Sequence, residues 1–210
     1  MNKLSLAIVS ALALSACGKP ADTTMADLTT GMNHYLAAQG NLCLAKNSWP
    51  IDVTQNEIDA HARNALQMPV LEKLGLVSSG TAVVDVKDED RSATIKVKRY
   101  ELTDEGKKYY LTKEMRRMAS DGGTQIQQGD FCAAKLTLDK VVKWDEIKSN
   151  DGQKKAVVTY TYKVDAAPWT RDADVQKVFP VVARIVNGAG TEQLQETLKM
   201  TAQGWVANEM

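Results

Sequence analysis

Three cysteines constrain this chain more than any other feature. Cys17 lies near the N-terminus, whereas Cys43 and Cys132 lie far apart along the chain. In an oxidising compartment, an even pair of cysteines usually forms a disulfide. If Cys17 is used elsewhere, a Cys43–Cys132 bond closes a loop of about 90 residues, worth up to about 4.6 kcal/mol. The alternatives are two separate buried thiols or a catalytic cysteine, and the sequence contains no Cys-x-x-Cys motif.

The N-terminus decides which compartment applies. Lys3 precedes an apolar run from Leu4 to Leu14 that only Ser10 interrupts. A transmembrane helix needs about 20 apolar residues, so this run is too short to span a bilayer permanently. It is typical of a signal peptide. The next residues, Leu14-Ser15-Ala16-Cys17, resemble the lipobox of bacterial lipoproteins.

The lipobox resemblance implies a specific modification. The thiol of Cys17 would receive a diacylglycerol, the signal peptide 1–16 would be removed, and residues 17–24 would form a short polar tether. Gly18 stands where an aspartate would imply retention at the inner membrane. The resemblance therefore implies a lipid anchor on the periplasmic face of the outer membrane. The alternative is an ordinary signal peptide followed by a coincidental cysteine.

The charge balance argues against nucleic acid as a partner. The chain has 26 basic and 26 acidic residues, and removal of residues 1–16 takes away only Lys3 among them. A chain so close to neutral has no strong electrostatic field to draw it to DNA or to anionic lipid. Its 44% apolar and 25% charged residues are those of an ordinary globular protein.

Motifs that carry catalytic chemistry are missing from the sequence. It contains no Gly-x-Ser-x-Gly, no His-Glu-x-x-His and no glycine-rich phosphate loop. The two histidines, His34 and His61, are too few and too far apart in sequence for a typical zinc site. We therefore expect neither an enzyme nor a metal or other cofactor.

Periodicity predicts helices at the start of the mature chain. Residues Asp22–Ala38 carry apolar side chains at helical spacing, and residues 41–53 are more typical of an extended segment. A capping box at Thr54 begins a second helix. We expect Pro69 to interrupt that helix and a short further helix to run from there to Gly75.

Residues 80–102 predict a β-hairpin. Apolar and polar residues alternate on both sides of an acidic turn at residues 88–90, and Thr103 caps a short helical turn. The order of helix, hairpin and cap resembles the end of a winged helix, a fold that usually binds DNA. The neutral charge and the export signal indicate that this resemblance concerns the fold alone. Residues 109–118 fit a helix and a strand equally well.

The second half predicts a mainly antiparallel sheet. After a loop at residues 120–130, two long β-like runs at 131–147 and 154–169 are joined by a turn. One or two short helices broken at Pro180 follow, and two closing strands meet at a tight turn at Gly204.

The expected fold class is therefore α+β. Residues 25–120 would form a helical subdomain with a winged-helix-like hairpin. Residues 128–210 would form an antiparallel, β-rich subdomain with one or two short helices.

Several short landmarks are similar to those of a group of uncharacterised lipoproteins from Gram-negative bacteria. In chain order they are GDFCAAK, VVKW, VTYTYKV, APW and VQKVFP. The resemblance covers most of the mature chain. It implies a location in the cell envelope and carries no catalytic or ligand-binding residues.

Two groups of side chains are candidates for a binding surface. Lys96, Lys98 and Arg99 would contribute to a basic face on the hairpin, and Trp144 and Trp169 would line a groove on the sheet. The simpler interpretations are a solvated strand for the cations and core packing for the tryptophans. We expect a lipid-anchored, non-enzymatic module that binds an envelope protein. The alternative is a small-ligand binder that uses an apolar pocket on the sheet.

Overall fold

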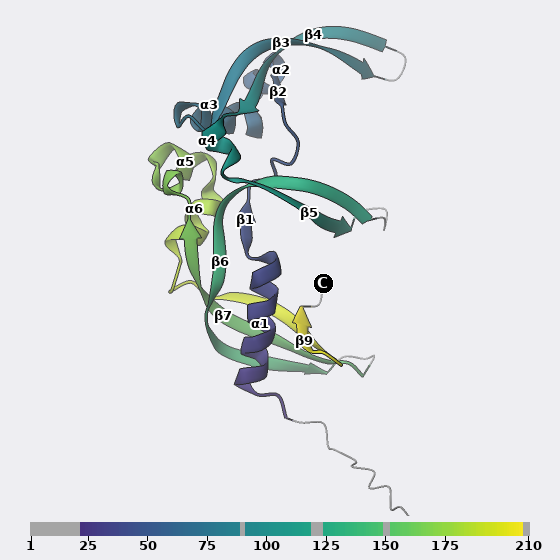
Figure 1. Cartoon of the computed structure of the whole chain (residues 1–210), viewed down its shortest axis with the longest axis vertical. Helices are drawn as coiled ribbons and strands as arrows, with labels where there is room; N and C mark the ends of the chain where they lie inside the picture. The colour runs from purple at the N-terminus through teal and green to yellow at the C-terminus, as the bar shows by residue number, and fades with distance from the viewer. Residues whose placement is uncertain (1–21, 89–90, 119–123, 149–151, 208–210) are drawn as a thin grey trace, which may run out of the picture.

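The computed structural model describes residues 22–88, 91–118, 124–148 and 152–207. Its strands form two sheets, a small one at the top of Figure 1 and a large one below it. The expected signal peptide, the lipidation site Cys17 and most of the tether lie outside the described residues. In the part of the chain that is described, no helix is both long and apolar enough to cross a membrane.

The large sheet follows the order β1-β6-β7-β8-β9, and β5 pairs with β6 off this path. All of its pairs are antiparallel, as the sequence predicts. Its strands are β1 (Asn41–Cys43), β5 (Tyr110–Met118), β6 (Thr124–Lys148), β7 (Lys154–Ala166), β8 (Leu194–Thr201) and β9 (Gly204–Ala207).

β6 is the longest strand described and connects the parts of this sheet. Its first residues, up to Phe131, pair with β5, and later residues pair with β1 and β7. The loop expected at residues 120–130 is wrong from Thr124 onward, because β6 begins there. The β5–β6 hairpin projects from the body of the protein (Figure 1). A projecting hairpin has little core to contact and needs few apolar residues. Its residues are therefore polar, and a polar composition is also typical of a loop. Residues 109–118, which fitted helix or strand, form β5 from Tyr110.

Helix α1 (Met25–Gln39) lies along the large sheet (Figure 1). It begins with a capping box between Thr24 and Asp27, close to the start predicted from periodicity. Its buried side chains pack against the sheet and form one of two hydrophobic cores. The fully packed members of this core include Leu28, Met32, Leu36, Val158, Tyr162, Leu198 and Trp205.

The small sheet follows the order β2-β4-β3. Its strands are β2 (Ile51–Thr54), β3 (Val77–Asp88) and β4 (Arg91–Leu102). β3 and β4 form the predicted hairpin, which pairs from Val77 opposite Leu102 to Asp88 opposite Arg91 without a bulge. Most of the expected acidic turn at residues 88–90 lies outside the described residues.

The helices next to the small sheet differ from the prediction. α2 (Gln55–Asp59) begins at the predicted capping box but ends early, and His61 has a positive φ of 50°. α3 (Arg63–Lys73) then runs through Pro69, where the sequence predicts an interruption. Met68 and Leu71 on either side of this proline are fully buried. Their packing outweighs the cost of about 3 kcal/mol that an interior proline imposes on a helix.

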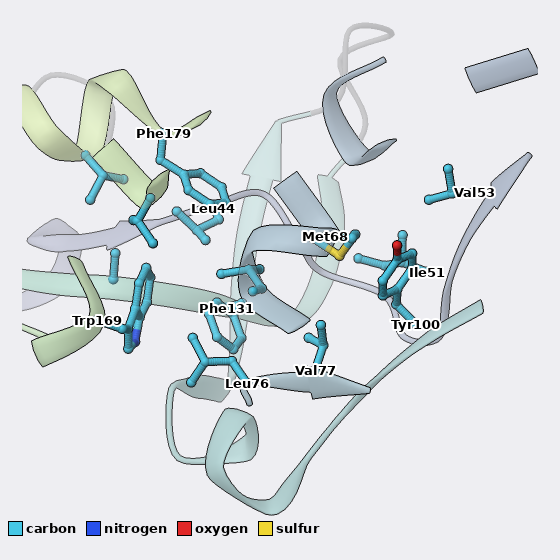
Figure 2. Close-up of a cluster of buried hydrophobic side chains, with 14 residues drawn as sticks. Leu44, Ile51, Val53, Met68, Leu76, Val77, Tyr100, Phe131, Trp169 and Phe179 are labelled. Atoms are coloured by element: carbon cyan, nitrogen blue, oxygen red, sulfur yellow. The ribbon is translucent and has the colours of Figure 1, made fainter. Parts of the chain in front are cut away.

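A second core joins the two sheets (Figure 2). Phe131 of β6 lies at its centre, with Met68 and Leu71 from α3 and Trp169 from the C-terminal half around it. The short helices beside it are α4 (Asp104–Lys107), the 3₁₀ helix η1 (Pro168–Arg171), α5 (Ala173–Val178) and α6 (Pro180–Asn187). The break predicted at Pro180 is confirmed, because this proline is the first residue of α6.

The fold is thus α+β with a mainly antiparallel sheet and a few helices, as expected. Each core takes residues from both halves of the sequence, so residues 25–120 and 128–210 share their interiors. α1 packs on the large sheet, at a distance from α2 and α3 (Figure 1), so the fold does not establish a winged helix in the N-terminal part.

Candidate functional site

A groove of about 640 Å³ lies over the small sheet at the point where α2 meets it. Its volume is within the range of about 300–1,000 Å³ that is usual for binding pockets. The lining combines apolar, polar and basic groups and contains no carboxylate. It consists of Val53, Gln55, Ile58, Ser79, Gly80, Thr81, Lys96, Val97 and Lys98.

A local capping box positions one wall of the groove. Thr54 ends β2 with an extended backbone, and its hydroxyl accepts a hydrogen bond from the N–H of Glu57 at 3.2 Å. The carboxylate of Glu57 accepts the N–H of Thr54 at 2.8 Å. This arrangement turns the chain sharply from strand into helix and places Gln55 and Ile58 beside the sheet. Ile58 is 40% exposed, so part of its apolar surface is available in the groove.

Strand pairing places two predicted cations on the groove face. Lys96 of β4 lies opposite Val83, and Lys98 lies opposite Thr81. Directly opposed residues of an antiparallel pair point to the same side of the sheet, so these side chains share one face.

Arg99 does not join them. It follows Lys98 in the strand and therefore points to the other face of the sheet. There its guanidinium donates two hydrogen bonds of 2.7 Å to the carboxylate of Asp52, in the fork geometry that favours arginine. The pairing lowers the pKa of Asp52. The predicted basic face is therefore divided between the two sides of the sheet.

Lys98 is engaged in an ion pair within the fold. Its ammonium group donates to Glu72 of α3 at 3.1 Å and lies 4.9 Å above the ring centre of Tyr100. A hydrogen bond with Tyr100 and the nearby Glu72 carboxylate raise the pKa of Lys98. The hydroxyl of Ser79 donates to the same carboxylate and, together with Lys98, lowers the pKa of Glu72. Lys98 thus connects α3 to the hairpin.

Lys96 is the cation that remains available in the groove. Its side chain is exposed, and it forms no ion pair with any residue whose side chain is described. The groove therefore offers one spare positive charge beside a partly apolar floor.

The tryptophans serve mainly as packing residues. Trp169 is only 7% exposed and belongs to the core around Phe131. Trp144 is half-buried at the margin of the other core, so the two predicted site residues do not lie together. Neither lines the groove described above. Neither tryptophan lines a second hollow of about 410 Å³ beside β1 either. Its lining includes small residues such as Ala133 and Ala167 together with the charged Lys108, Lys135 and Asp165.

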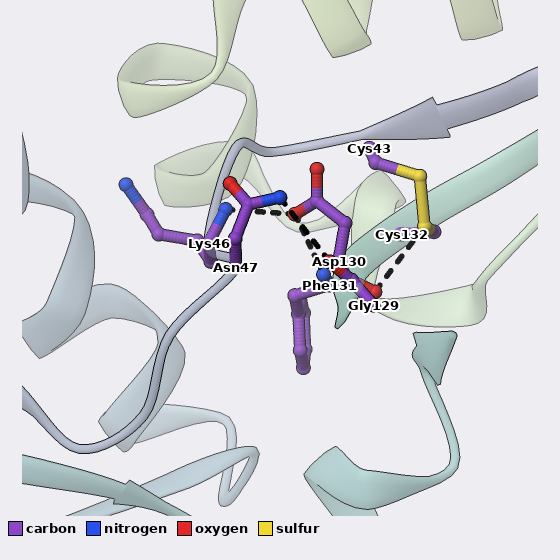
Figure 3. The surroundings of a disulfide bond; sticks show 7 residues. All are labelled: Cys43, Lys46, Asn47, Gly129, Asp130, Phe131 and Cys132. Atoms are coloured by element: carbon purple, nitrogen blue, oxygen red, sulfur yellow. Dashed lines mark hydrogen bonds between the residues drawn. A yellow bond between two sulfur atoms is a disulfide. The ribbon is translucent and has the colours of Figure 1, made fainter. Parts of the chain in front are cut away.

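The predicted disulfide is present. Cys43 of β1 and Cys132 of β6 lie opposite each other in the sheet and are bonded (Figure 3). The bond joins segments 89 residues apart in the sequence. It stands at the edge of the second hollow, where Cys132 contributes to the lining.

A buried polar cluster, which no sequence motif marks, adjoins the disulfide. Asp130 is fully buried, and its Oδ1 accepts the backbone N–H groups of Lys46 and Phe131 at 2.7 Å each. The ammonium group of Lys46 donates to Asn64 at 2.7 Å. Burial, followed by repulsion from Arg63, lowers the pKa of Lys46 to about 8, against the opposing attraction of Asp130. Asp130 was missed because it lies at the end of a segment with the composition of a loop.

One oxygen of the cluster, Oδ2 of Asp130, is buried without a hydrogen-bond partner among the described residues. The side chains of the cluster are packed within the fold, and neither hollow includes them. Among the described residues, no group of three histidine, cysteine, aspartate or glutamate side chains is placed to hold a metal ion. The cluster is best understood as a tie between the residue 44–47 segment and β6.

Comparisons with protein-family models, with curated proteins and with solved structures found no match. The resemblance to Gram-negative lipoproteins therefore remains a prediction from the sequence.

Proposed function

We propose that this chain is a lipid-anchored protein of the bacterial envelope, held at the outer membrane through Cys17, whose folded body binds another envelope protein. The binding surface is the groove between α2 and the β3–β4 hairpin. The observation that carries the proposal is the lining of this groove, which combines the exposed Ile58 with Lys96, a cation without an ion pair to any described side chain. Exposed apolar side chains rimmed by polar groups are typical of protein-binding surfaces.

Two further features support this proposal. The apolar run and the sequence Leu14-Ser15-Ala16-Cys17 have the pattern of a lipoprotein signal. The Cys43–Cys132 disulfide is consistent with a protein that folds in an oxidising compartment such as the periplasm. A non-enzymatic role fits the absence of recognisable catalytic motifs from the sequence.

We also propose that residues 51–102 are a winged-helix-like unit adapted to protein binding. The chain order β2-α2-α3-β3-β4 and the strand order β2-β4-β3 support this idea. Two of the cations that could contact phosphates, Lys98 and Arg99, are already paired with Glu72 and Asp52. A protein partner therefore suits this unit better than DNA.

One experiment tests both halves of the proposal. A photo-cross-linking amino acid is introduced in cells at Thr81, inside the groove, and separately at Lys163, an exposed position on β7. We expect a discrete protein adduct from position 81 in the outer-membrane fraction and none from position 163. In a Cys17→Ser background, which blocks lipidation, the chain should leave the outer-membrane fraction. Equal adducts from both positions, or a soluble wild-type chain, would contradict the proposal.

A further inference from the structure

β3 has one open edge along its whole length. All residues from Val77 to Asp88 pair with β4 on one side. The strand is the last in the order β2-β4-β3, and no other described strand lies on its outer side. Alternate N–H and C=O groups along this edge therefore lack a strand partner. Figure 1 shows the β3–β4 hairpin at the top of the molecule.

The first part of this edge, residues 77–84, lacks the usual protection against pairing, whereas Asp85, Lys87 and Asp88 follow in the same strand. Open edges in natural proteins are commonly short, bulged, charged or interrupted by proline. The strands at the two ends of the large sheet's main order, β1 and β9, have 3 and 4 residues, and β5, which pairs with β6 off this order, has 9. β3 has 12 residues and pairs without a bulge, and its residues 77–84 include neither a charge nor a proline. Val83 on this strand is 65% exposed.

β3 also contributes to the groove. Ser79 and Thr81 of β3 belong to its lining, together with Lys96 of β4. A strand added beside β3 would lie about 4.8 Å from it, with every second side chain on the groove face. Those side chains would pass close to Val83 and Lys96, which lie opposite each other. The flexible four-carbon stem of lysine allows its ammonium group to reach across β3.

The charge of the groove indicates which side chains fit. Its lining contains no carboxylate, Lys98 is paired with Glu72, and Lys96 has no ion-pair partner among the side chains described. Asp85, on the same face of the hairpin, lies outside this lining and accepts a hydrogen bond from Thr94. An incoming strand with carboxylates on alternate positions would pair with Lys96, whereas a basic strand would be repelled.

We propose that β3 accepts an extended, acidic segment of a partner protein as an additional strand, with its carboxylates beside Lys96. This inference rests on the proposed function and specifies how the partner is recognised. Main-chain hydrogen bonds to the β3 edge supply affinity, and the groove selects the side chains.

The test uses a fluorescent heptapeptide of alternating glutamate and valine, titrated against the full membrane-extracted chain in detergent micelles. We expect saturable binding, measured by fluorescence anisotropy, with a dissociation constant below about 1 mM. The same peptide with lysine in place of glutamate should bind at least about tenfold more weakly. Methylation of alternate peptide nitrogens should abolish binding, because it removes the N–H groups that pair with the edge.

Matched protein variants test the assignment of the residue. Lys96→Glu should weaken binding of the acidic peptide at least about tenfold, whereas Lys140→Glu, at an exposed position on β6, should leave it unchanged. An equal effect of both variants, or undiminished binding of the methylated peptide, would overturn strand addition at β3.

Sedimentation of the chain alone provides a second check. A dimer that Val83→Lys dissociates would show that the edge takes a second copy instead.

The two proposals fail in different ways. If the peptide does not bind but the cross-linker at Thr81 still captures an envelope protein, the proposed function stands and strand addition is wrong. If both fail, the groove is not a protein-binding surface.

Discussion

The carboxylate of Asp130 holds the backbone of Lys46, 84 residues earlier in the chain. Its Oδ1 accepts the N–H of Lys46 at 2.7 Å and the N–H of Phe131 at the same distance (Figure 3). The segment that contains Lys46 has no regular structure, and Ala45 within it has a positive φ of 56°. One buried side chain therefore satisfies two buried donors that no helix or sheet serves.

Removing this acceptor should destabilise the protein more than removing its charge. Asp130→Ala leaves two buried N–H groups unpaired, so we expect the free energy of unfolding to fall by about 3 kcal/mol. Asp130→Asn keeps an acceptor at Oδ1 and should cost clearly less. Urea unfolding of the two variants measures the difference. Equal losses would show that the charge of Asp130, rather than its hydrogen bonds, stabilises this segment.

Lys46 should make stability depend on pH in the alkaline range. Its side chain is 4% exposed, and burial is the main cause that lowers its pKa to about 8. In the unfolded chain its pKa returns to about 10.4. Between these two values the unfolded state binds more protons than the folded state, so stability rises with pH. The full gain is at most about 3 kcal/mol, is complete above about pH 10.4 and is absent below about pH 8.

The matched variant for this prediction is Lys46→Met, which keeps the length of the side chain but cannot titrate. Urea unfolding of both proteins at pH 7 and pH 10 gives the difference between them at each pH, in which the tyrosine contributions cancel. We expect wild type to gain stability relative to the variant on going from pH 7 to pH 10. A constant difference would mean that Lys46 titrates normally in the folded protein.

The disulfide should stabilise the protein mainly by restricting the conformations of the unfolded chain. The bond joins residues 89 apart in sequence, and a closed loop of this length is worth about 4.6 kcal/mol in the chain-entropy model. The free energy of unfolding of the double variant Cys43→Ser, Cys132→Ser should therefore be lower by about 2–5 kcal/mol. Wild type treated with a reductant is the control and should match the variant. A variant as stable as the oxidised protein would contradict this prediction.

Local signals account for the parts of the fold that the sequence predicts correctly. The capping boxes at Thr24 and Thr54 mark helix starts, and alternation marks the β3–β4 hairpin, because each depends on residues close in sequence. The disulfide follows from the number of cysteines and the expected compartment. Helix α3 continues through Pro69 because of tertiary packing, which no local pattern encodes.

The groove could not be predicted for a related reason. In the sequence, one basic cluster is formed by Lys96, Lys98 and Arg99. Strand alternation assigns Arg99 to the opposite face but does not say what lies on either face. The partner of Arg99, however, is Asp52, which is 47 residues away. The open edge of β3 likewise depends on which strands pair, and this is a property of the whole fold.

Gly31 should be required for the contact between α1 and the last strand. A Cβ at this position would lie 2.7 Å from the carbonyl oxygen of Trp205 and 3.0 Å from its Cβ. Alanine favours a helix over glycine by about 1 kcal/mol, but here the backbone of β9 blocks the added methyl group. We expect Gly31→Ala to lower the free energy of unfolding by about 1–3 kcal/mol, as is usual for overpacked cores.

Asn33→Ala, at an exposed position of the same helix, is the control and should change stability little. Thermal unfolding of both variants measures the effect. A stabilised Gly31→Ala protein would mean that α1 can move away from Trp205 without cost, and that the helix is held to the sheet mainly by Leu28, Met32 and Leu36.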